Sequence, residues 1–470
     1  MTEIRGGGMY YLQNRWKLEQ NVLRYYGLRN KSNMFHNTVK LNKKQIAIVK
    51  KLPCELDEKE LKTVAKLLGE QIVEKSELFV TPKSLDEAKF CVDCAANDYI
   101  IPGLEFDENG RCPMCQTKEE TRKLRSIVPV MNKFPRSKKS RFDVALFYTG
   151  GKDSTYMLYY LSKTLNLRVL ALTWEIPFIS DSAKQSIEGA KRLLPNVEFI
   201  TRKISDNDLK AIYRRLYSLS ENTCACPSLA YALFYPELVA TKTPYFVVGN
   251  ETAQIVRLYY NHMAPKFAYT FSSNKFLNFL INLGRIFTLH PPLKKGQLHT
   301  LATMKQLAYG DNPLKNAAGY RNTLISNVVE AIHTVPHIVK PLKSAIRRSS
   351  RSGNIPRFVQ VDFDEISGGK YDWKKIKDTL VEACGWVAPE ISDKGLHTSC
   401  KIEKCKEHSQ FKRFYNMQSD MIPFSALEIS LASRDGNVTR EKAIEEIKTA
   451  LGFTLDEPPE CEIMKGYIER

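Results

Sequence analysis

The chain has 470 residues, which is too long for one compact core and predicts two or three domains. A hydrophobic content of 43% and a charged content of 26% are typical of globular proteins and exclude general disorder. No apolar run reaches the roughly eighteen residues that would predict a membrane-spanning helix, and the first residues lack the apolar core of a signal peptide. The eleven cysteines, several in close pairs, favour metal or sulfur chemistry in a reducing compartment and predict a cytoplasmic protein.

The formal net charge of +18 is spread unevenly along the chain. Residues 262–360 contain fourteen lysines and arginines against two acidic residues, a net +12. Such a concentration favours binding to a polyanion or to an anionic membrane surface. A solvated basic face would have the same composition, so charge alone leaves these alternatives open.

Residues 1–87 are interpreted as an N-terminal appendage. A short helix is expected at 16–26, and the spacing of Leu61, Val64, Leu67 and Leu68 predicts a helix at 58–68. No residue pattern in this part indicates chemistry.

Two cysteine pairs follow, Cys91-Val-Asp-Cys94 and Cys112-Pro-Met-Cys115, with seventeen residues between them. Two Cys-x2-Cys turns at this separation are typical of a tetrahedral zinc site with four thiolate ligands and no open position. A redox-active pair would instead be a single motif following a strand. Residues 88–131 are therefore predicted to form a small zinc ribbon with a structural Zn²⁺.

A strand, a glycine turn and a helix start follow in direct succession. Residues 144–148 are apolar, as a buried parallel strand requires, and lead into Thr149-Gly-Gly-Lys-Asp-Ser154. Gly150 and Gly151 permit a tight turn in which backbone amides approach an anion without a Cβ in the way. Lys152 could add a cation and Ser154 a hydroxyl. The pattern differs from the Gly-x4-Gly-Lys-Ser/Thr loop of the common nucleoside triphosphatases.

This sequence resembles the PP-loop (Ser-Gly-Gly-x-Asp-Ser) of the N-type ATP pyrophosphatases, with Thr149 in place of the first serine. The resemblance implies that ATP and Mg²⁺ bind here, that a carbonyl oxygen is adenylylated, and that AMP and pyrophosphate are released. It implies catalytic roles for Lys152, Asp153 and Ser154: Lys152 and the loop amides would hold the pyrophosphate, and Asp153 would orient the loop or bind Mg²⁺.

Further apolar strands are expected at 167–173, 197–201 and 243–251, with a helix at 181–194. Strands that alternate with helices predict a doubly wound parallel α/β sheet. The family resemblance narrows this fold to the adenine nucleotide alpha hydrolase-like (HUP) type. Ligands of such sheets bind at the carboxyl ends of the strands. Together with the family resemblance, in which a Gly-x-Asn or Gly-Glu-Asn turn at this point faces the nucleotide, this position implies the following ATP-binding residues: Tyr148, Thr149, Gly150, Gly151, Lys152, Asp153, Ser154, Thr173, Gly249, Asn250 and Glu251.

Four other cysteines form a possible sulfur or cluster site. Cys224 and Cys226 precede an apolar helix expected at 229–238, whose dipole could lower their pKa, although small buried residues would give the same pattern. Cys400 and Cys405 follow in the C-terminal part. PP-loop sulfurtransferases of tRNA carry cysteines in this part of the fold, as persulfide carriers or iron–sulfur ligands, but with Cys-x-x-Cys spacing.

The basic insertion, 262–357, contains an amphipathic helix expected at 276–287, whose apolar face more often packs in a core than on a membrane. With the arginines at 347–351 it could also line a cleft for a nucleotide-linked sugar or a tRNA. These assignments divide the chain into residues 1–87, the ribbon at 88–131, the PP-loop domain at 132–261, the insertion at 262–357, and a helical C-terminal region at 358–470 that completes the site.

The segment Phe106-Asp-Glu-Asn-Gly-Arg-Cys112 and the C-terminal element around residues 428–443 resemble zinc-ribbon N-acetyl sugar amidotransferases of surface-polysaccharide biosynthesis. In that element Thr439 is expected to cap a helix, and Arg434 and Arg440 to contact phosphates or solvent. The resemblance implies that an acetamido sugar is converted to an acetamidino sugar with ammonia from a separate glutaminase subunit.

The alternative is sulfur transfer to a tRNA or a small molecule, with or without an iron–sulfur cluster. A helix is also expected at 373–383. A nucleotide-sensing scaffold without activity fits poorly with an intact loop. The sequence leaves the acceptor and the transferred atom open.

Overall fold

The computed structural model describes residues 8–29, 37–124, 126–220, 225–261, 275–310, 325–389, 400–450 and 452–469. Cys224, one of the four cysteines expected at a sulfur site, lies outside these residues. None of the described helices is both long enough and apolar enough to cross a membrane.

A five-stranded parallel sheet forms the centre of the molecule. Its spatial order is β11-β10-β7-β8-β9, so the chain builds outward on one side of β7 and then returns to the other side. This is the predicted doubly wound α/β arrangement, and the four predicted strands are confirmed. The fifth strand, β11, was not predicted. The strands are β7 (Val144–Phe147), β8 (Val169–Glu175), β9 (Val197–Lys203), β10 (Tyr245–Asn250) and β11 (Arg357–Asp362).

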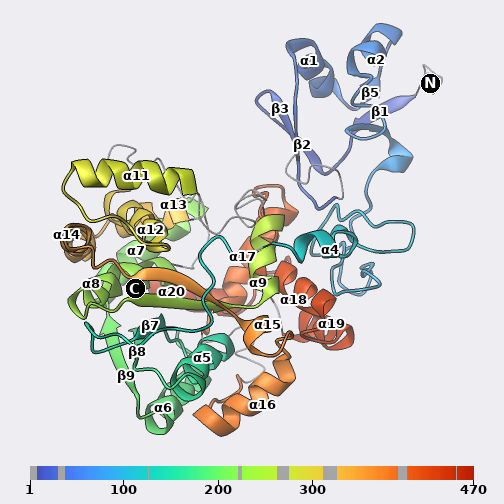
Figure 1. Cartoon of the computed structure of the whole chain (residues 1–470). Coiled ribbons are helices and arrows are strands. Elements are labelled where there is room, and N and C mark those ends of the chain that lie inside the picture. The colour runs from blue at the N-terminus through green and yellow to red at the C-terminus, as the bar shows by residue number, and fades with distance from the viewer. Residues whose placement is uncertain are drawn as a thin grey trace.

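Apolar side chains cover both faces of the sheet because successive residues of a strand point to opposite sides. Val144 and Leu146 pack in the core on one face, whereas Ala145 packs on the other. The first face is covered by α5 (Lys152–Tyr159), α6 (Asp181–Leu193) and α16 (Trp373–Cys384) (Figure 1). The predicted helices at 181–194 and 373–383 are thus confirmed.

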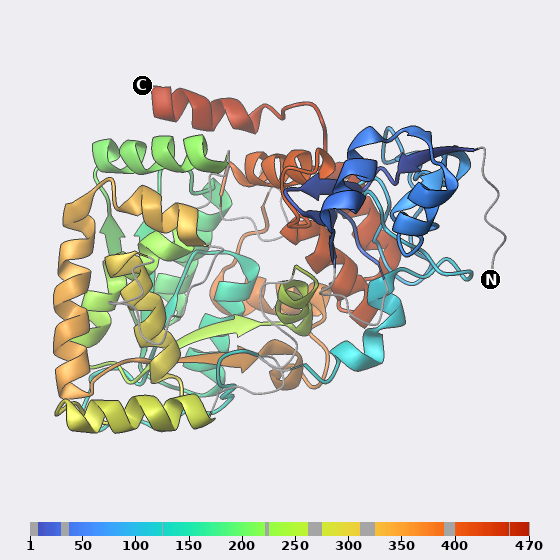
Figure 2. The same ribbon diagram turned by 90° about the horizontal axis from the view of Figure 1, so that it is seen from above.

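The basic insertion covers the second face of the sheet. Its helices α12 (Gln297–Tyr309), α13 (Ser326–Ile332) and α14 (Pro336–Ser352) pack against α7 (Asp206–Ser220) and α8 (Cys226–Ala240). The insertion is therefore a long connection between the adjacent strands β10 and β11 and contributes to the core. Its remaining described helix, α11 (Lys275–Phe287), lies at the outer edge of the molecule (Figure 2).

Helices from the C-terminal third pack around α9 (Thr252–Tyr260), the helix that directly follows the carboxyl end of β10. α18 (Phe424–Asp435) packs on α9, and α17 (Glu403–Tyr415) contacts both α18 and α20 (Glu460–Glu469). A short helix, α15 (Phe363–Ile366), follows β11 directly. The Thr439 side chain accepts a hydrogen bond from the amide of Lys442 at the start of α19 (Arg440–Thr449), which confirms the predicted cap.

The N-terminal part forms two three-stranded antiparallel sheets with a core of its own. The helix expected at 16–26 is wrong: Trp16–Glu19 and Val22–Tyr25 are paired strands, β2 and β3, and Gln20 between them has a φ of 55°. A turn with a left-handed residue favours a hairpin. The helix expected at 58–68 is confirmed as α2 (Glu58–Val64). The remaining elements here are β1 (Met9–Leu12), β4 (Thr38–Lys40), β5 (Cys54–Glu55), β6 (Ile72–Glu74), α1 (Lys43–Lys51) and a 3₁₀ turn (Lys75–Glu77).

Candidate functional site

The glycine turn after β7 has the strand–turn–helix geometry that the sequence predicts. Gly150 has a φ of 76°, and a Cβ built on it would lie 2.5 Å from the carbonyl oxygen of Ala183 in α6. A side chain at this position would therefore be excluded both by the backbone conformation and by lack of space. The indole of Trp386 donates a hydrogen bond to the Gly150 carbonyl (3.2 Å), which fixes the turn from the C-terminal part.

The first turn of α5 lacks a side-chain cap. Gly151 is the N-cap residue and supplies no side chain, so the N-terminal amides of α5 are available to an external acceptor. The Ser154 hydroxyl donates to the Gly151 carbonyl (3.1 Å) and lies 3.2 Å from the Thr149 hydroxyl. An uncapped helix start bordered by two hydroxyl groups is a suitable site for a phosphate group.

Two cavities open beside this turn. One, of about 230 Å³, lies between the carboxyl ends of β7 and β10, where the strand order of the sheet reverses. Ligands of doubly wound sheets bind at this position. The structure thus brings together five residues from the predicted ATP site that line this cavity: Thr149, Asp153, Ser154, Gly249 and Asn250.

The second cavity, of about 240 Å³, extends from the same turn along β8 and is largely apolar. Thr149 borders both cavities, and the far wall of the second cavity includes Cys226, Cys400, Glu403 and Lys406. Two of the predicted sulfur-site cysteines therefore reach the ligand edge of the sheet from different parts of the chain.

The ammonium group of Lys152 is not placed at the phosphate position that the sequence suggested. Lys152 is 4% exposed, and its Nζ lies 4.3 Å from the ring centroid of Tyr371 and 4.6 Å from that of Trp373. It also lies 2.7 Å from Oδ1 of Asp153. Cation–π contact with two rings and an ion pair direct this side chain toward the C-terminal part.

Asp153 is held from several directions. Its Oδ1 accepts a hydrogen bond from the Tyr371 hydroxyl (2.9 Å), and its Oδ2 accepts one from Gln254 Nε2 (2.7 Å). With Lys152 also at Oδ1, both carboxylate oxygens have protein partners. Of the two roles expected for Asp153, orienting the loop fits these contacts better than binding Mg²⁺.

Glu251, expected to face the nucleotide, is fully buried instead. Its carboxylate accepts hydrogen bonds from Trp373 Nε1 (3.0 Å) and from Asn437 Nδ2 (2.7 Å). Burial raises the pKa of Glu251 to about 7, and the neighbouring Asp153 acts in the same direction, whereas Lys152 opposes the shift. Glu251 thus connects β10 to the C-terminal part.

Tyr148 and Thr173 also have structural contacts. The Tyr148 side chain is buried, with its hydroxyl donating to the Ser186 carbonyl (3.1 Å). The Thr173 hydroxyl donates to the Tyr148 carbonyl (3.0 Å), so it supports the backbone just before the turn. An ideal Cβ on Gly249 would lie 2.1 Å from the Phe363 ring. Close packing against this ring therefore leaves no room for a side chain at position 249.

Sequence reasoning missed the buried polar network behind the loop. Gln254 donates to Glu428 (3.0 Å) as well as to Asp153, and Glu428 forms an ion pair with Arg257. Burial lowers the pKa of Arg257 to about 10. The only sequence signal was the presence of ionisable residues in otherwise apolar helices, as at Glu428 in α18. Their partners are distant in the chain and could not be inferred.

Two further cysteines, Cys405 and Cys461, interact with each other. Cys405 in α17 and Cys461 in α20 are both buried, and a hydrogen bond to Cys405 raises the pKa of Cys461 well above its usual range. Cys405 belongs to the same apolar core as Cys226 and Cys400. Cys461 was not among the predicted residues.

Cys91, Cys94, Cys112 and Cys115 come together as predicted, with all four sulfur atoms buried and within 4.8 Å of one another. Cys91 and Cys115 have an Sγ–Sγ distance of 3.8 Å, and Cys94 and Cys112 one of 3.6 Å. A tetrahedral ion with Zn–S bonds of about 2.3 Å requires sulfur atoms about 3.8 Å apart. The geometry and the soft thiolate donors therefore fit Zn²⁺. Among the described residues, no other group of three or more potential ligands is brought together.

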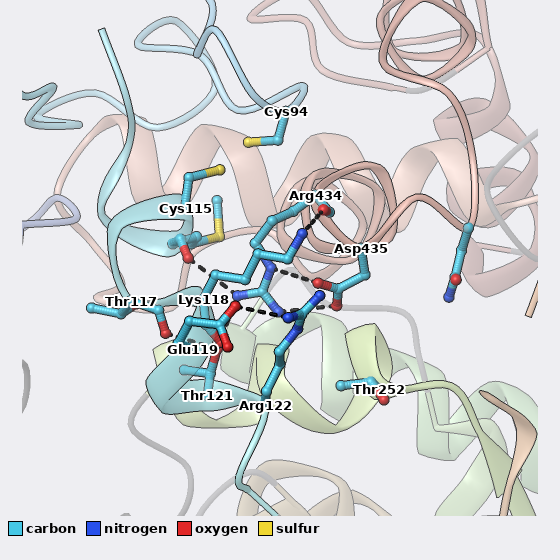
Figure 3. A network of polar contacts seen from close by, with 12 residues as sticks. Cys94, Cys115, Thr117, Lys118, Glu119, Thr121, Arg122, Thr252, Arg434 and Asp435 are labelled. Atoms are coloured by element: carbon cyan, nitrogen blue, oxygen red, sulfur yellow. Dashed lines mark hydrogen bonds and ion pairs between the residues drawn. The ribbon is translucent and has the colours of Figure 1, made fainter. Parts of the chain in front are cut away.

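Two arginines of the C-terminal element contact this four-cysteine segment (residues 88–124): Arg434 is buried, contrary to the expectation of phosphate or solvent contact, whereas Arg440 is half-buried. Arg434 is 5% exposed and donates to the Met114 carbonyl (3.1 Å) and the Thr121 hydroxyl (2.9 Å) (Figure 3). Lys118 returns a hydrogen bond to the Arg434 carbonyl (2.7 Å). Arg440 donates to the Cys91 carbonyl (3.0 Å).

No protein-family model and no curated protein matches the chain. Among solved structures, the chain is similar to the U34-tRNA thiolase NcsA from Methanococcus maripaludis, determined with its 4Fe–4S cluster. The alignment covers 57% of this chain and 86% of that chain, with 19% sequence identity and a TM-score of 0.23. These values are too low to transfer a function.

Proposed function

We propose that this protein is an AMP-forming, ATP-dependent enzyme of the PP-loop type that adenylylates a carbonyl oxygen of its acceptor. The observation that carries this proposal is the turn of residues 149–154, which presents the uncapped start of α5 at the edge where the strand order reverses. A parallel sheet with such a turn is suited to binding the phosphates of a nucleotide.

In the proposed reaction, the acceptor oxygen attacks the α-phosphorus of ATP and pyrophosphate leaves. The amides at the start of α5 and the hydroxyls of Thr149 and Ser154 would stabilise the negative charge that develops on the leaving group. Asp153 would hold the turn in place through Tyr371 and Gln254. A nucleophile then adds to the activated carbon, and the former carbonyl oxygen leaves with AMP.

We favour sulfur as the transferred atom, because Cys226 and Cys400 line the cavity that continues from the turn. In its simplest form the nucleophile is hydrosulfide, which replaces the carbonyl oxygen without any change in redox state. A persulfide on one of the two thiols would be an equivalent carrier, and it would require a sulfane-sulfur donor and a reductant. An iron–sulfur cluster at this place would require at least one further ligand beyond Cys226 and Cys400.

Nitrogen transfer is the second candidate, and the sequence of residues 106–112 supports it. In that case ammonia replaces sulfide, and Cys226 and Cys400 are only part of an apolar cavity wall. The acceptor in either case is proposed to be anionic, a nucleotide-linked sugar or a tRNA, because the insertion is strongly basic. A structural Zn²⁺ at Cys91, Cys94, Cys112 and Cys115 and a cytoplasmic location complete the proposal.

The test uses the full chain with ATP, Mg²⁺ and a panel of acceptors, offered with either sulfide or ammonia. AMP and pyrophosphate should form only in the presence of the correct acceptor, and Ser154→Ala should lower the rate by at least ~10²-fold. Mass spectrometry of the acceptor distinguishes replacement of oxygen by sulfur from replacement by nitrogen. ADP and phosphate as products would refute the proposed reaction.

The double variant Cys226→Ser/Cys400→Ser tests the choice of atom. It should retain acceptor-dependent formation of AMP with hydroxylamine as a chemical trap, and it should retain product formation from free sulfide. It should lose product formation from a sulfane-sulfur donor with a reductant, because that route requires a persulfide on one of the two thiols. Cys54→Ser is the matched control, since Cys54 lies in the separate N-terminal core. Full product formation by the double variant with ammonia would show that nitrogen, and not sulfur, is the transferred atom.

A further inference from the structure

Helix α11 displays a row of large apolar side chains on the surface of the molecule. Phe276, Phe279, Leu280, Leu283, Ile286 and Phe287 are each between 41% and 80% exposed, and Leu289 just beyond the helix is 93% exposed. Their spacing places them along one side of the helix. The sequence-based expectation that this apolar face packs in the core is therefore wrong.

The opposite side of α11 is held by specific contacts. Asn282 accepts a hydrogen bond from the Leu293 amide (2.7 Å) and donates to the Leu293 carbonyl (3.2 Å). Arg285 donates to the carbonyls of Pro291 (2.8 Å) and Ser350 (2.9 Å), which fastens α11 to the end of α14. These polar contacts hold the other side of α11 against the molecule and leave the apolar row exposed. The helix itself lies at the outer edge of the molecule (Figure 2).

The surroundings of the row are cationic. No aspartate or glutamate occurs between Glu251 and Asp311, a stretch with seven lysines and arginines. Lys275 at the start of α11 and Lys294 and Lys295 after it are exposed. Exposed arginines also occur in α14 on both sides of Ser350, at positions 347, 348 and 351. An apolar helix face bordered by cations, with no acidic residue nearby in sequence, complements an anionic lipid surface.

We propose that α11 binds the surface of a membrane that contains anionic lipids, with the row of residues 276–289 inserted among the headgroups. Thirteen residues at about 1.5 Å each give a helix of about 20 Å, too short to cross a hydrocarbon core of about 30 Å, so α11 would lie in the membrane plane. This inference does not depend on the proposed reaction.

Vesicle sedimentation with the full chain tests this inference. The protein should bind vesicles of phosphatidylcholine with a third phosphatidylglycerol, and bind pure phosphatidylcholine vesicles more weakly. Raising NaCl from 0.1 to 0.5 M should weaken binding, because the electrostatic screening length falls from about 10 Å to about 4 Å and the cationic border is screened. Phe279→Ser/Leu283→Ser/Phe287→Ser should reduce the vesicle affinity by at least ~10-fold. The reason is that three apolar side chains, which are transferred from water into the membrane on binding, are replaced by polar ones.

Val80→Ser/Val381→Ser is the matched control, since both valines are exposed and lie outside α11. It should bind vesicles like the wild type, and both variants should keep the wild-type unfolding temperature because the altered side chains are on the surface. Absence of wild-type binding, or equal binding by the α11 variant, overturns the proposal. A wild-type dimer that becomes monomeric in the α11 variant, with no vesicle binding, would assign this face to a second copy and also overturn it.

Discussion

Gly150 shows how a single residue type is required by two independent constraints. Its positive φ costs an L-residue about 1–2 kcal/mol, and the carbonyl of Ala183 occupies the place of a Cβ. Gly368 has a φ of 82° but open space around it, so it isolates the first constraint. We expect Gly150→Ala to destabilise the protein clearly more than Gly368→Ala and to abolish pyrophosphate release.

Urea unfolding at a fixed pH measures both variants. Both substitutions should lose the same free energy of unfolding through the positive φ. Any further loss for Gly150→Ala therefore measures the displacement of α6 from the turn. Equal destabilisation by the two substitutions would contradict the close contact with Ala183.

Glu251 predicts a pH dependence of stability. Its pKa is about 7 in the folded protein and near 4.5 when unfolded, so the folded state binds the proton more tightly. This contribution to stability is complete below about pH 4.5 and is lost as the pH rises through 7. Glu251→Gln should therefore lose less stability than the wild type between pH 5 and pH 8, by on the order of 1–3 kcal/mol.

Unfolding free energies at pH 5 and pH 8 provide the measurement. Glu119→Gln, at a side chain that is 78% exposed, should leave the wild-type difference unchanged. Glu407, whose pKa burial also raises to about 7, should behave like Glu251 when replaced by glutamine. An unaltered pH dependence in Glu251→Gln would refute the assigned shift.

At the scale of elements, the four-cysteine segment has almost no regular secondary structure. Its described helices, α3 (Pro113–Gln116) and α4 (Lys118–Thr121), have four residues each. Such a segment depends on its metal and on its neighbours for stability. Arg434 and Arg440 supply the neighbouring contacts from α18 and α19.

The purified protein should contain one zinc per chain, and Cys112→Ser should lower both zinc content and thermal stability. Cys54→Ser, in the N-terminal core, should retain the metal. Elemental analysis and a thermal melt of the same samples check the prediction. A stable wild-type protein without zinc would rule out a structural metal.

At the scale of the whole molecule, the chain returns to its own sheet after a long connection. β11 pairs with β10 over six residue pairs, and Tyr371 and Trp373, just beyond it, cover Lys152. The N-terminal part, by contrast, has a separate core and touches the C-terminal helices through contacts such as Arg15 to the Phe414 and Tyr415 carbonyls.

The two ends of the chain should therefore tolerate removal differently. A chain that begins at residue 82 should retain a cooperative thermal transition and its zinc, because the sheet and its covering helices remain. A chain that stops at residue 355 should fail to fold, because β10 loses β11, one of its two neighbouring strands, and the buried side chains of Lys152 and Glu251 lose their contacts with Trp373. Circular dichroism melts of both chains decide the matter; a folded 1–355 chain would contradict this account.

The sequence by itself determined the features that depend on neighbours in the chain. The apolar strands, the turn around Gly150, the cap at Thr439 and the paired cysteines each follow from local backbone and side-chain requirements, and the structure contains all of them. The hairpin at residues 16–25 is the local feature that was misjudged. The available signal was the alternation of apolar and polar residues in Trp16-Lys-Leu-Glu19 and Leu23-Arg-Tyr25, and the structure buries Trp16, Leu23 and Tyr25.

Only the tertiary structure decided where the polar side chains of the loop point. Lys152 is buried because rings from beyond β11 surround it, and Glu251 because Trp373 and Asn437 do so. The apolar face of α11 is exposed because Asn282 and Arg285 fix the helix by its other side. Such outcomes depend on which distant segments meet, and the free energy of those contacts cannot be obtained from local sequence patterns.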